Sequence, residues 1–485
     1  MELGNIENIY FIGIGGIGMS AIARYFNLRG AKVSGYDKTE TPLTQALQAE
    51  GIDIHFDENV NAIPKNVDVV VYTPAIPKEH LELVYYQQNN FTVIKRSDML
   101  QLITDQSKVI AVAGTHGKTT TSSMVAHLLK HSGFDCTAFL GGITANYNSN
   151  FLVGKNDWVV VEADEYDRSF LKLFPQIAVI TAVDPDHLDI YKGGLADFEN
   201  TFLDFAKQLK PNGKLFLKKN VPIENRVVAM FSSGAVSDLQ SETFEQADFK
   251  SVTNKQRITN PLQLSTYDLQ NNAANIFTEN IIYNNGTYHF DVNFCGKLFK
   301  GFELNVHGLY NIENALAAIA VALELKIEEA AIKAAIASFK GVKRRFEYIV
   351  KNEKTIYIDD YAHHPNEIAP FLNSVRKIYS DKKITVIFQP HLFSRTKDFA
   401  EGFSKSLSLC DELILLPIYP ARELPMEGIN SEMLLQNISI ENKKVVLKEN
   451  LMNELKTREI EVLCTIGAGD IDQFIEPIKN YLLKL

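Results

Sequence analysis

The chain has 485 residues, of which 46% are hydrophobic and 22% charged, and its formal net charge is −10. This length predicts two to four domains, and the acidic balance argues against a nucleic-acid partner. No apolar run reaches the roughly 18 residues of a membrane span, no basic segment opens a signal peptide, and the four cysteines lack metal or disulfide spacing. We therefore expect a cytoplasmic protein that is not inserted in a membrane.

The first hundred residues alternate predicted strands and helices. Four segments have the length and composition of strands: 8–14, 31–36, 67–72 and 91–94. Helical spacing follows at 19–28 and again at 96–103. Strands that alternate with helices predict a parallel sheet with helices on both faces.

A glycine-rich loop stands between the first strand and the first helix. Gly13, Gly15 and Gly18 form a GxGxxG pattern that also contains Gly16, and Asp37 ends the second strand about 20 residues on. Such a loop places backbone amides at a helix N-terminus, where they bind a diphosphate. Taken alone, the pattern leaves a redox dinucleotide, a UDP-type ligand and simple tight packing open.

A second series begins after a polar break at 106–108. A strand at 109–113 leads through a glycine-rich loop into a helix at 119–131. The loop residues are Gly114, Thr115, His116, Gly117, Lys118, Thr119 and Thr120. Glycines let backbone amides approach a triphosphate, Lys118 adds a positive charge, and Thr119 can offer its hydroxyl to Mg²⁺. Val112 replaces the first glycine of the general pattern, so the loop is a shortened variant, and a structural glycine turn is the alternative.

Acidic residues follow two further predicted strands, at 158–162 and 177–183. Glu162 ends the first strand, and the clusters behind the two strands contain Asp164, Glu165, Asp167, Asp184, Asp186, His187 and Asp189. Neighbouring parallel strands end at one sheet edge, where hard oxygen ligands suit Mg²⁺ held by the phosphate loop. His187 is a candidate ligand for a second metal ion. The alternative is that both clusters are solvated loops that cap helices.

The rest of the chain completes a predicted three-domain α/β protein. A hairpin is expected around 284–286, a helix at 311–325, and further strands at 355–358, 384–388, 412–416 and 461–466. The predicted domains are a Rossmann-like sheet at 1–106, a mostly parallel P-loop ATPase-like sheet at 107–341, and a Rossmann-like α/β domain at 342–485.

Seven motifs resemble those of the Mur ligase family and occur in the same order along the chain. Besides the phosphate loop and the acidic strand ends, they include GIGGIGMS at 13–20, NIENALAA at 311–318, GVKRRFE at 341–347 with DDYAHHP at 359–365, QPHLFSRT at 389–396 and GAGD at 467–470. The resemblance implies transfer of the γ-phosphoryl group of ATP to the lactyl carboxylate of UDP-N-acetylmuramate, followed by attack of L-alanine on the acyl phosphate. A related activity in the family, attachment of a recycled tripeptide to the same UDP-sugar, is the alternative.

The resemblance also implies roles for individual residues. The glycine loop and Asp37 would hold the UDP-sugar, and Thr119, Glu162 and His187 would hold Mg²⁺. Further residues implied at the nucleotide are Asn314, Arg345 and Asp360, and those implied at the amino acid and muramoyl group are Tyr361, His363, His391 and Arg395. Lys118, Glu162, His187, His363 and Arg395 would form the catalytic set, with the C-terminal domain closing on ATP in a monomer or homodimer. The alternative for Asn314 is a buried polar helix residue. Without the resemblance, His363 and His391 read more readily as core or capping histidines.

Three positions depart from the family pattern. Leu392 replaces a common arginine, and Tyr310 replaces a common histidine. Phe202 stands at the spacing where sibling ligases carry a carbamylated lysine, and Lys207 lies off that spacing, so we predict no carbamate. Two other functional classes are weighed: a dehydrogenase using the first glycine loop, against which the phosphate loop argues, and a non-catalytic nucleotide-binding regulator, against which the retained Lys118 and Glu162 argue.

Overall fold

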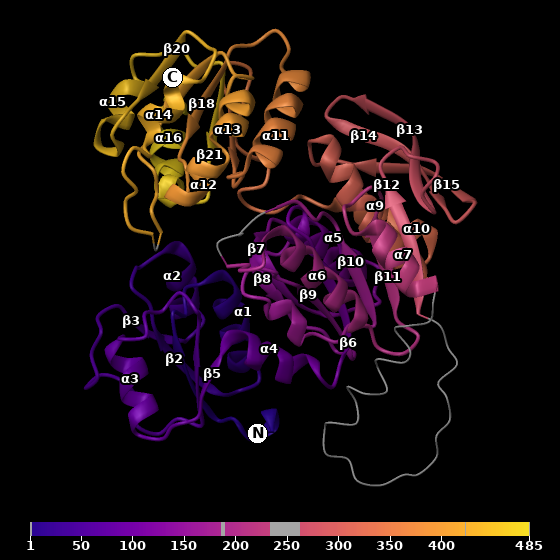
Figure 1. Ribbon diagram of the computed structural model, residues 1–485, viewed down its shortest axis with the longest axis vertical. Coiled ribbons are helices and arrows are strands. Elements are labelled where there is room, and N and C mark those ends of the chain that lie inside the picture. Colours follow the sequence, from indigo (N-terminus) through magenta and orange to yellow (C-terminus); the bar gives the residue numbers. More distant parts are fainter. Residues whose placement is uncertain (1, 186–189, 233–261, 422, 485) are drawn as a thin grey trace. The chain divides into compact units, whose positions relative to one another are not determined.

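The computed structural model describes residues 2–185, 190–232, 262–421 and 423–484. Contacts divide the chain into two compact units, residues 1–305 with 313–339 and residues 306–312 with 340–485. The first unit contains two sheets and the second contains one (Figure 1). The predicted α/β class with three sheet-centred domains is confirmed, whereas the exact domain boundaries stay a prediction. Within the described ranges, no helix is both long and apolar enough to cross a membrane.

The first sheet is fully parallel, in the order β3-β2-β1-β4-β5. Its strands are β1 (Asn8–Ile12), β2 (Lys32–Tyr36), β3 (Asp53–His55), β4 (Val69–Tyr72) and β5 (Val93–Lys95). A 3-10 turn, η1 (Leu3–Asn5), precedes β1, and the helices are α1 (Ile17–Leu28), α2 (Pro42–Ala49), α3 (Leu81–Gln88) and α4 (Arg96–Thr104). Strand β3 and helices α2 and α3 were missing from the prediction, because 3 and 8 residues carry little periodicity.

Strand β1 is shorter than the predicted 8–14. Gly13 has a φ of +88°, and the backbone amides of Gly13 and Ile14 both donate to the carbonyl of Tyr36, at 2.8 and 3.0 Å. A left-handed residue followed by two bonds to one carbonyl turns the chain away from the strand direction. The glycine-rich loop therefore begins directly at the carboxyl edge of the sheet.

The second sheet has ten strands, in the order β15-β14-β13-β12-β11-β10-β6-β9-β7-β8. They are β6 (Lys108–Ala113), β7 (Thr137–Thr144), β8 (Ser149–Leu152), β9 (Trp158–Glu162), β10 (Ile177–Ile180), β11 (Lys214–Lys218), β12 (Gln263–Asp268), β13 (Ile276–Asn284), β14 (Thr287–Phe294) and β15 (Lys297–Leu304). The strands from β7 to β13 pair in parallel, and antiparallel strands extend both ends. The predicted hairpin is confirmed: Asn285 and Gly286 both have positive φ, as a two-residue turn requires.

Helices of the second sheet position the loops at its carboxyl edge. They are α5 (Lys118–His131), α6 (Gly194–Lys207), α7 (Glu224–Ser232), α9 (Leu309–Glu324), α10 (Glu329–Ser338) and the 3-10 turn η2 (Ser169–Lys172). One continuous cluster of buried apolar residues extends from the first sheet into this one. Arg24 on α1 bonds Asn150 on β8 at 2.5 Å, and Asn150 donates to the carbonyl of Ile17 at 2.5 Å. The two sheets of the first unit are thus packed together at α1.

The second unit is built on a six-stranded sheet in the order β16-β17-β21-β18-β19-β20. Its strands are β16 (Glu347–Lys351), β17 (Ile356–Asp360), β18 (Ile384–Phe388), β19 (Glu412–Leu415), β20 (Asn442–Val445) and β21 (Val462–Ile466). Its helices are α11 (Pro365–Ile378), α12 (Phe393–Asp398), α13 (Ala400–Leu407), α14 (Ser431–Gln436), α15 (Leu451–Leu455) and α16 (Ile475–Leu482), with 3-10 turns η3 (Lys448–Asn450) and η4 (Asp470–Phe474). Successive strand residues face opposite sides, so Ile358 and Tyr357 belong to separate buried clusters.

Candidate functional site

The phosphate loop joins β6 to α5, and two of its glycines are required by their surroundings. Gly114 has a φ of +128°, and a Cβ there would lie 2.3 Å from Thr181 Oγ1. Gly117 has a φ of +81° and precedes α5, and its Cβ would lie 2.6 Å from Asn314 Oδ1. Both glycines are therefore required by the packing of neighbouring elements around the loop, and phosphate binding by this loop stays a prediction.

Lys118, at the start of α5, is largely buried and bound to a carboxylate. Its Nζ donates to both oxygens of Glu165 at 2.9 and 2.8 Å, and Glu165 lies just beyond the end of β9. Burial favours a lower pKa for Lys118, but the carboxylates of Glu165, Asp164 and Glu162 outweigh it and raise the pKa. Burial raises the pKa of Glu165, and Lys118 opposes this rise. Lys118 is therefore a fixed positive charge at the position where a phosphate is expected.

Thr119 and Glu162 lie together, as the sequence predicted for a magnesium site. Thr119 Oγ1 donates to Glu162 Oε1 at 3.0 Å, and the amide of Gly141 donates to Glu162 Oε2 at 3.0 Å. A Cβ on Gly141 would lie 2.2 Å from Glu162 Oε2, so the carboxylate rests directly against the β7 backbone. A hydroxyl and a carboxylate beside a phosphate loop form a donor set that suits Mg²⁺. Among the described residues, no three His, Cys, Asp or Glu side chains gather as a metal-binding group.

The segment after β10 is tied to the phosphate loop. The amide of Asp184 donates to Thr115 Oγ1 at 3.1 Å, and its carboxylate lies 3.6 Å from His116 Nε2. Thr181 Oγ1 also donates to the carbonyl of His116. The second acidic strand end therefore reaches the loop, as expected for neighbouring parallel strands. Asp186, His187 and Asp189 lie outside the described residues, so the expected role of His187 stays a prediction.

Asn314 of α9 lies against the phosphate loop from the other side. Its Oδ1 accepts from Thr121 Oγ1 at 3.1 Å, and its side chain is nearly buried. Thr120, one residue earlier, is also buried in the first turn of α5. This contact joins residues 193 positions apart. The polar position of α9 thus supports the loop, and its contact with nucleotide stays a prediction.

The first glycine loop is closed by Asp37. Gly15 donates its backbone amide to Asp37 Oδ2 at 2.8 Å, and Thr39 donates to Oδ1 at 3.2 Å. The amide of Gly16 donates back to the carbonyl of Gly13 at 3.2 Å. Asp37 therefore shapes the loop in this structure, and its predicted contact with a sugar nucleotide is not tested.

The second unit brings several predicted residues together around Tyr361. The Arg345 guanidinium lies 5.0 Å from the Tyr361 ring centroid and 3.8 Å from Glu367. Asp360 accepts the amides of Phe346 and Ala362, both at 2.7 Å. Burial raises the pKa of Asp360 to about 6, while Arg345 opposes the rise. Asp360 thus orders the loop that presents Arg345 and Tyr361.

His363, His391 and Arg395 form a second group in the same unit. The two histidine rings lie 6.0 Å apart edge to face, and His391 stacks on Tyr419 at 5.7 Å. Arg395, on α12, lies 3.3 Å from His391 through Nη1 and Nδ1. His363 Nδ1 lies 3.3 Å from Glu367 and 3.0 Å from the carbonyl of Tyr361. The structure therefore brings these three residues together. Both histidines are only partly buried, and their roles at the amino acid stay a prediction.

The three departures from the family pattern have clear places in the structure. Leu392 is buried at a φ of +71° and donates its amide to the carbonyl of Tyr419 at 2.9 Å. Tyr310 packs on the buried cluster of the second unit. Phe202 is fully buried, and Lys207 on α6 pairs with Asp204 at 2.8 Å. The expected absence of a carbamate stays a prediction.

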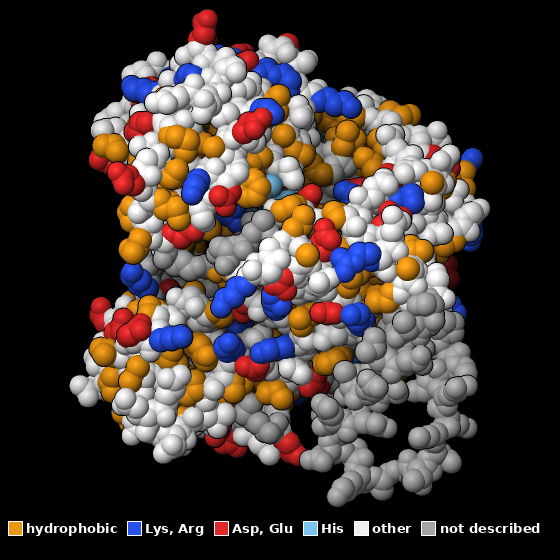
Figure 2. Space-filling view, viewed as in Figure 1, with side chains coloured by type: hydrophobic (Ala, Val, Ile, Leu, Met, Phe, Trp, Pro, Cys, Tyr) orange, Lys and Arg blue, Asp and Glu red, His pale blue; other side chains and the backbone are white. Residues whose placement is uncertain are grey.

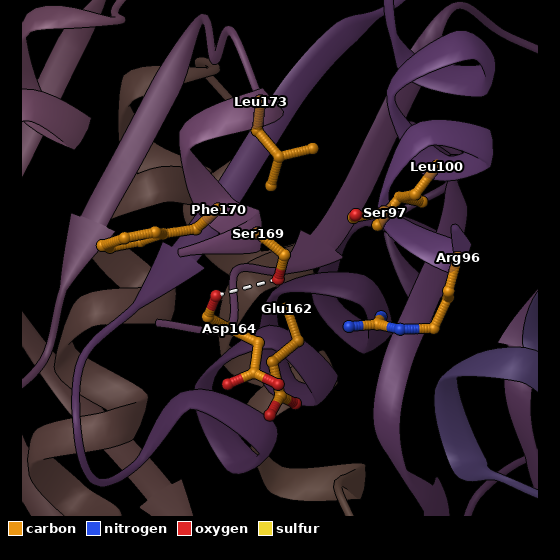
Figure 3. A pocket seen from close by; sticks show the side chains of 8 residues that line it. All are labelled: Arg96, Ser97, Leu100, Glu162, Asp164, Ser169, Phe170 and Leu173. Carbon is orange, nitrogen blue, oxygen red and sulfur yellow. Dashed lines mark hydrogen bonds between the residues drawn. The ribbon is translucent and has the colours of Figure 1, made fainter. Parts of the chain in front are cut away.

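Arg96 is a residue at this site that sequence reasoning missed. It follows β5 directly and lines a small pocket together with Glu162 and Asp164 (Figure 3). The other lining residues are Ser97, Leu100, Ser169, Phe170 and Leu173. Its position at the carboxyl end of a parallel strand was the available signal, because binding residues concentrate at that edge.

Three family models match the chain in sequence order. They are the Mur ligase family catalytic domain at residues 8–108, the Mur ligase middle domain at 112–258 and 244–322, and the Mur ligase glutamate ligase domain at 344–469. The chain belongs to the Mur ligase family. The family resemblance inferred from the motifs is thus confirmed over most of the sequence.

Full-length relatives narrow the family to one type of member. The chain is 45% identical to the UDP-N-acetylmuramate–L-alanine ligase of Cytophaga hutchinsonii, over 99% of this chain and 97% of that protein. It is 46% identical to the ligase of the same name from Flavobacterium johnsoniae, over 99% of both chains. A crystal structure of the UDP-N-acetylmuramate–alanine ligase of Thermotoga maritima matches with a TM-score of 0.80 and 27% identity, over 99% of this chain and all of that one. The Mur ligase is therefore most like the members that carry this name.

Proposed function

We propose that this Mur ligase joins L-alanine to the lactyl carboxylate of UDP-N-acetylmuramate at the expense of ATP, during synthesis of peptidoglycan precursors in the cytoplasm. The observation that carries the proposal is the phosphate loop with Lys118 beside the Thr119–Glu162 pair, in a chain with two full-length relatives named for this reaction. Attachment of a recycled tripeptide to the same sugar is less supported, because these two relatives carry the name of the alanine enzyme.

The nucleotide half of the proposal rests on the phosphate loop. Backbone amides between Gly114 and Gly117, together with the Lys118 ammonium, would bind the phosphates of ATP. Thr119 and Glu162 would hold Mg²⁺, and His187 is proposed as a ligand of a second metal ion. When bound, Mg²⁺ would neutralise charge on the phosphate oxygens. Asn314, Arg345 and Asp360 are proposed to contact the nucleotide or the loops around it.

The chemistry divides into two balanced steps. In the first, a lactyl carboxylate oxygen attacks the γ-phosphorus, the bond to the β–γ bridging oxygen breaks, and ADP leaves with an acyl phosphate formed. In the second, the neutral amine of L-alanine attacks the acyl carbon, the carbon–oxygen bond to phosphate breaks, and inorganic phosphate and a proton leave. Lys118 supplies fixed positive charge where negative charge develops in the first step.

The amino-acid half of the proposal belongs to the second unit. Arg395 is proposed to bind the alanine carboxylate, since a guanidinium pairs with a carboxylate through two parallel hydrogen bonds. Tyr361, His363 and His391 are proposed to face the alanine and the muramoyl group. Their mutual ring contacts support one shared site.

The deciding experiment measures phosphate release from ATP and Mg²⁺ with UDP-N-acetylmuramate, with and without L-alanine. We expect release that needs both co-substrates, and a product heavier than the UDP-sugar by one alanyl residue. Release with the tripeptide but not with L-alanine would move the assignment to the recycling activity. No phosphate release with any amine would contradict the ligase proposal.

A further inference from the structure

The pocket beside Glu162 holds a charged side chain that the reaction outlined above does not use. Arg96 is half-buried, and Figure 3 shows its guanidinium directed into the pocket toward Glu162. In the described part of the chain, Arg96 makes no hydrogen bond or ion pair. A guanidinium carries five N–H donors and stays charged at any relevant pH. An oxyanion from outside the chain can accept hydrogen bonds from such a partly buried guanidinium and balance its charge.

The neighbouring cation has a different environment. Lys172, on η2, bonds the Asp98 carboxylate and Ser97 Oγ, the latter at 3.1 Å. Its charge is thus already compensated within the protein. Figure 2 shows several Lys and Arg side chains on the face of the first unit near α1 and α4. Among the described residues, Lys172 has a carboxylate partner and Arg96 has none. Arg96 is therefore available to bind a ligand, and Lys172 serves as a matched control.

Arg96 stands between the two nucleotide loops of the first unit. It begins α4 at the carboxyl edge of the first sheet, while Glu162 ends β9 at the carboxyl edge of the second. On the other side it touches Gly18, in the first turn of α1, where a Cβ would lie 2.9 Å from Arg96 Nη1. A single guanidinium thus lies between the glycine loop proposed for the UDP-sugar and the carboxylate proposed for Mg²⁺.

We propose that Arg96 binds an oxyanion of the sugar nucleotide as that substrate extends from the glycine loop toward Glu162. This inference rests on the proposed function, because it requires a sugar nucleotide at the first glycine loop. Two groups of UDP-N-acetylmuramate have the required chemistry, the diphosphate and the lactyl carboxylate. ATP phosphates are the weaker candidate, because Lys118 and the α5 N-terminus already provide their positive charge.

The first test compares Arg96→Met, Arg96→Lys and the control Lys172→Met by calorimetry with UDP-N-acetylmuramate. We expect Arg96→Met to weaken binding by about 10–100-fold, as loss of a charge-assisted pair predicts, with an intermediate loss for Arg96→Lys. Lys172→Met should bind like the wild type. The KM for ATP should stay unchanged in the Arg96 variants, which separates a substrate contact from general damage to the site.

UDP-N-acetylglucosamine, which has the diphosphate but no lactyl carboxylate, assigns the contact. Equal weakening of both ligands by Arg96→Met identifies the diphosphate, and weakening of UDP-N-acetylmuramate alone identifies the carboxylate. Unchanged binding of both ligands would overturn the inference while leaving the ligase proposal intact. A wild-type protein that binds neither ligand would instead overturn the proposed function.

Gly18→Ala provides a second, independent variant. Alanine favours the helix by about 1 kcal/mol over glycine, so the fold should persist while the new methyl displaces the flexible Arg96 head group. We expect Gly18→Ala to weaken sugar-nucleotide binding in the wild-type background and to add nothing in the Arg96→Met background. Full additivity of the two substitutions would contradict displacement of the Arg96 head group as the cause of the Gly18→Ala effect.

Discussion

At the scale of single residues, the site depends on charged side chains that are held in place by hydrogen-bond partners. Lys118 is held by Glu165, and Glu162 is held by Thr119 and the Gly141 amide. These bonds fix the positions of Lys118 and Glu162, and groups with fixed positions need less reorganisation during reaction.

The ammonium of Lys118 gives the first prediction. Lys118→Ala should lower the rate of phosphate release by at least about 100-fold, because it removes a fixed charge from the transferred phosphoryl group. Calorimetry should still detect UDP-N-acetylmuramate binding, since the first glycine loop is a separate site. Loss of sugar-nucleotide binding in this variant would show that the two sites are not separate.

Gly141 gives the second prediction, again at a single residue. Gly141→Ala places a methyl 2.2 Å from the position of Glu162 Oε2, so the carboxylate must move. We expect the Mg²⁺ concentration for half-maximal activity to rise several-fold, measured by titrating Mg²⁺ at saturating ATP. Gly4→Ala is the control, because its Cβ meets nothing within 4 Å. An unchanged Mg²⁺ requirement in Gly141→Ala would argue against Glu162 as a metal ligand.

At the scale of elements, helix α5 is fastened to α10 through one buried histidine. His127 Nε2 donates to the carbonyl of Ala335 at 3.1 Å, and Nδ1 lies 3.0 Å from the Tyr147 hydroxyl. Burial, with a smaller contribution from the neighbouring His131, lowers the pKa of His127 to about 4, and the hydrogen bond to Ala335 opposes this fall. The helix that begins at Lys118 therefore depends on a histidine that stays neutral.

This histidine predicts how stability depends on pH. Its folded pKa lies below the ordinary value of 6.5, so the contribution is fully present above pH 6.5 and is lost as the pH falls toward 4. The shift corresponds to a loss on the order of 3 kcal/mol. Chemical unfolding at several pH values should show a shallower dependence for His127→Gln than for the wild type. The exposed His131→Gln should give a slope between those of the wild type and His127→Gln, because His131 contributes to the lowered pKa of His127. Equal slopes in all three proteins would contradict the assignment.

At the scale of the whole molecule, the residues proposed to bind the substrates are divided between two separately packed units. Lys118 and Glu162 belong to the first unit, and Arg345, His363 and Arg395 belong to the second. Reacting atoms must come within about 3–3.5 Å for transfer, so the roles proposed for these residues predict a closure step during reaction. This division follows from the connectivity of the three sheets.

The division predicts a change in solution scattering. Addition of UDP-N-acetylmuramate with a non-hydrolysable ATP analogue should lower the radius of gyration and narrow the pair-distance distribution. UDP-N-acetylmuramate alone should have a smaller effect, because its proposed site lies in the first unit. Identical profiles for the free protein and the ternary complex would contradict a closure step.

The sequence by itself determined both glycine loops, the acidic strand end at Glu162 and the family, because these are local patterns with distinctive spacing. It also predicted the neighbourhood of Thr119 and Glu162, since adjacent parallel strands end at one edge. It did not find Arg96, the Gly141 support or β3, whose signals are single residues or very short segments. Only the tertiary structure decided that Glu165 pairs with Lys118 and that Asn314 accepts a hydrogen bond from Thr121. Those contacts join residues far apart in the chain, and sheet order, which local periodicity does not encode, brings them together.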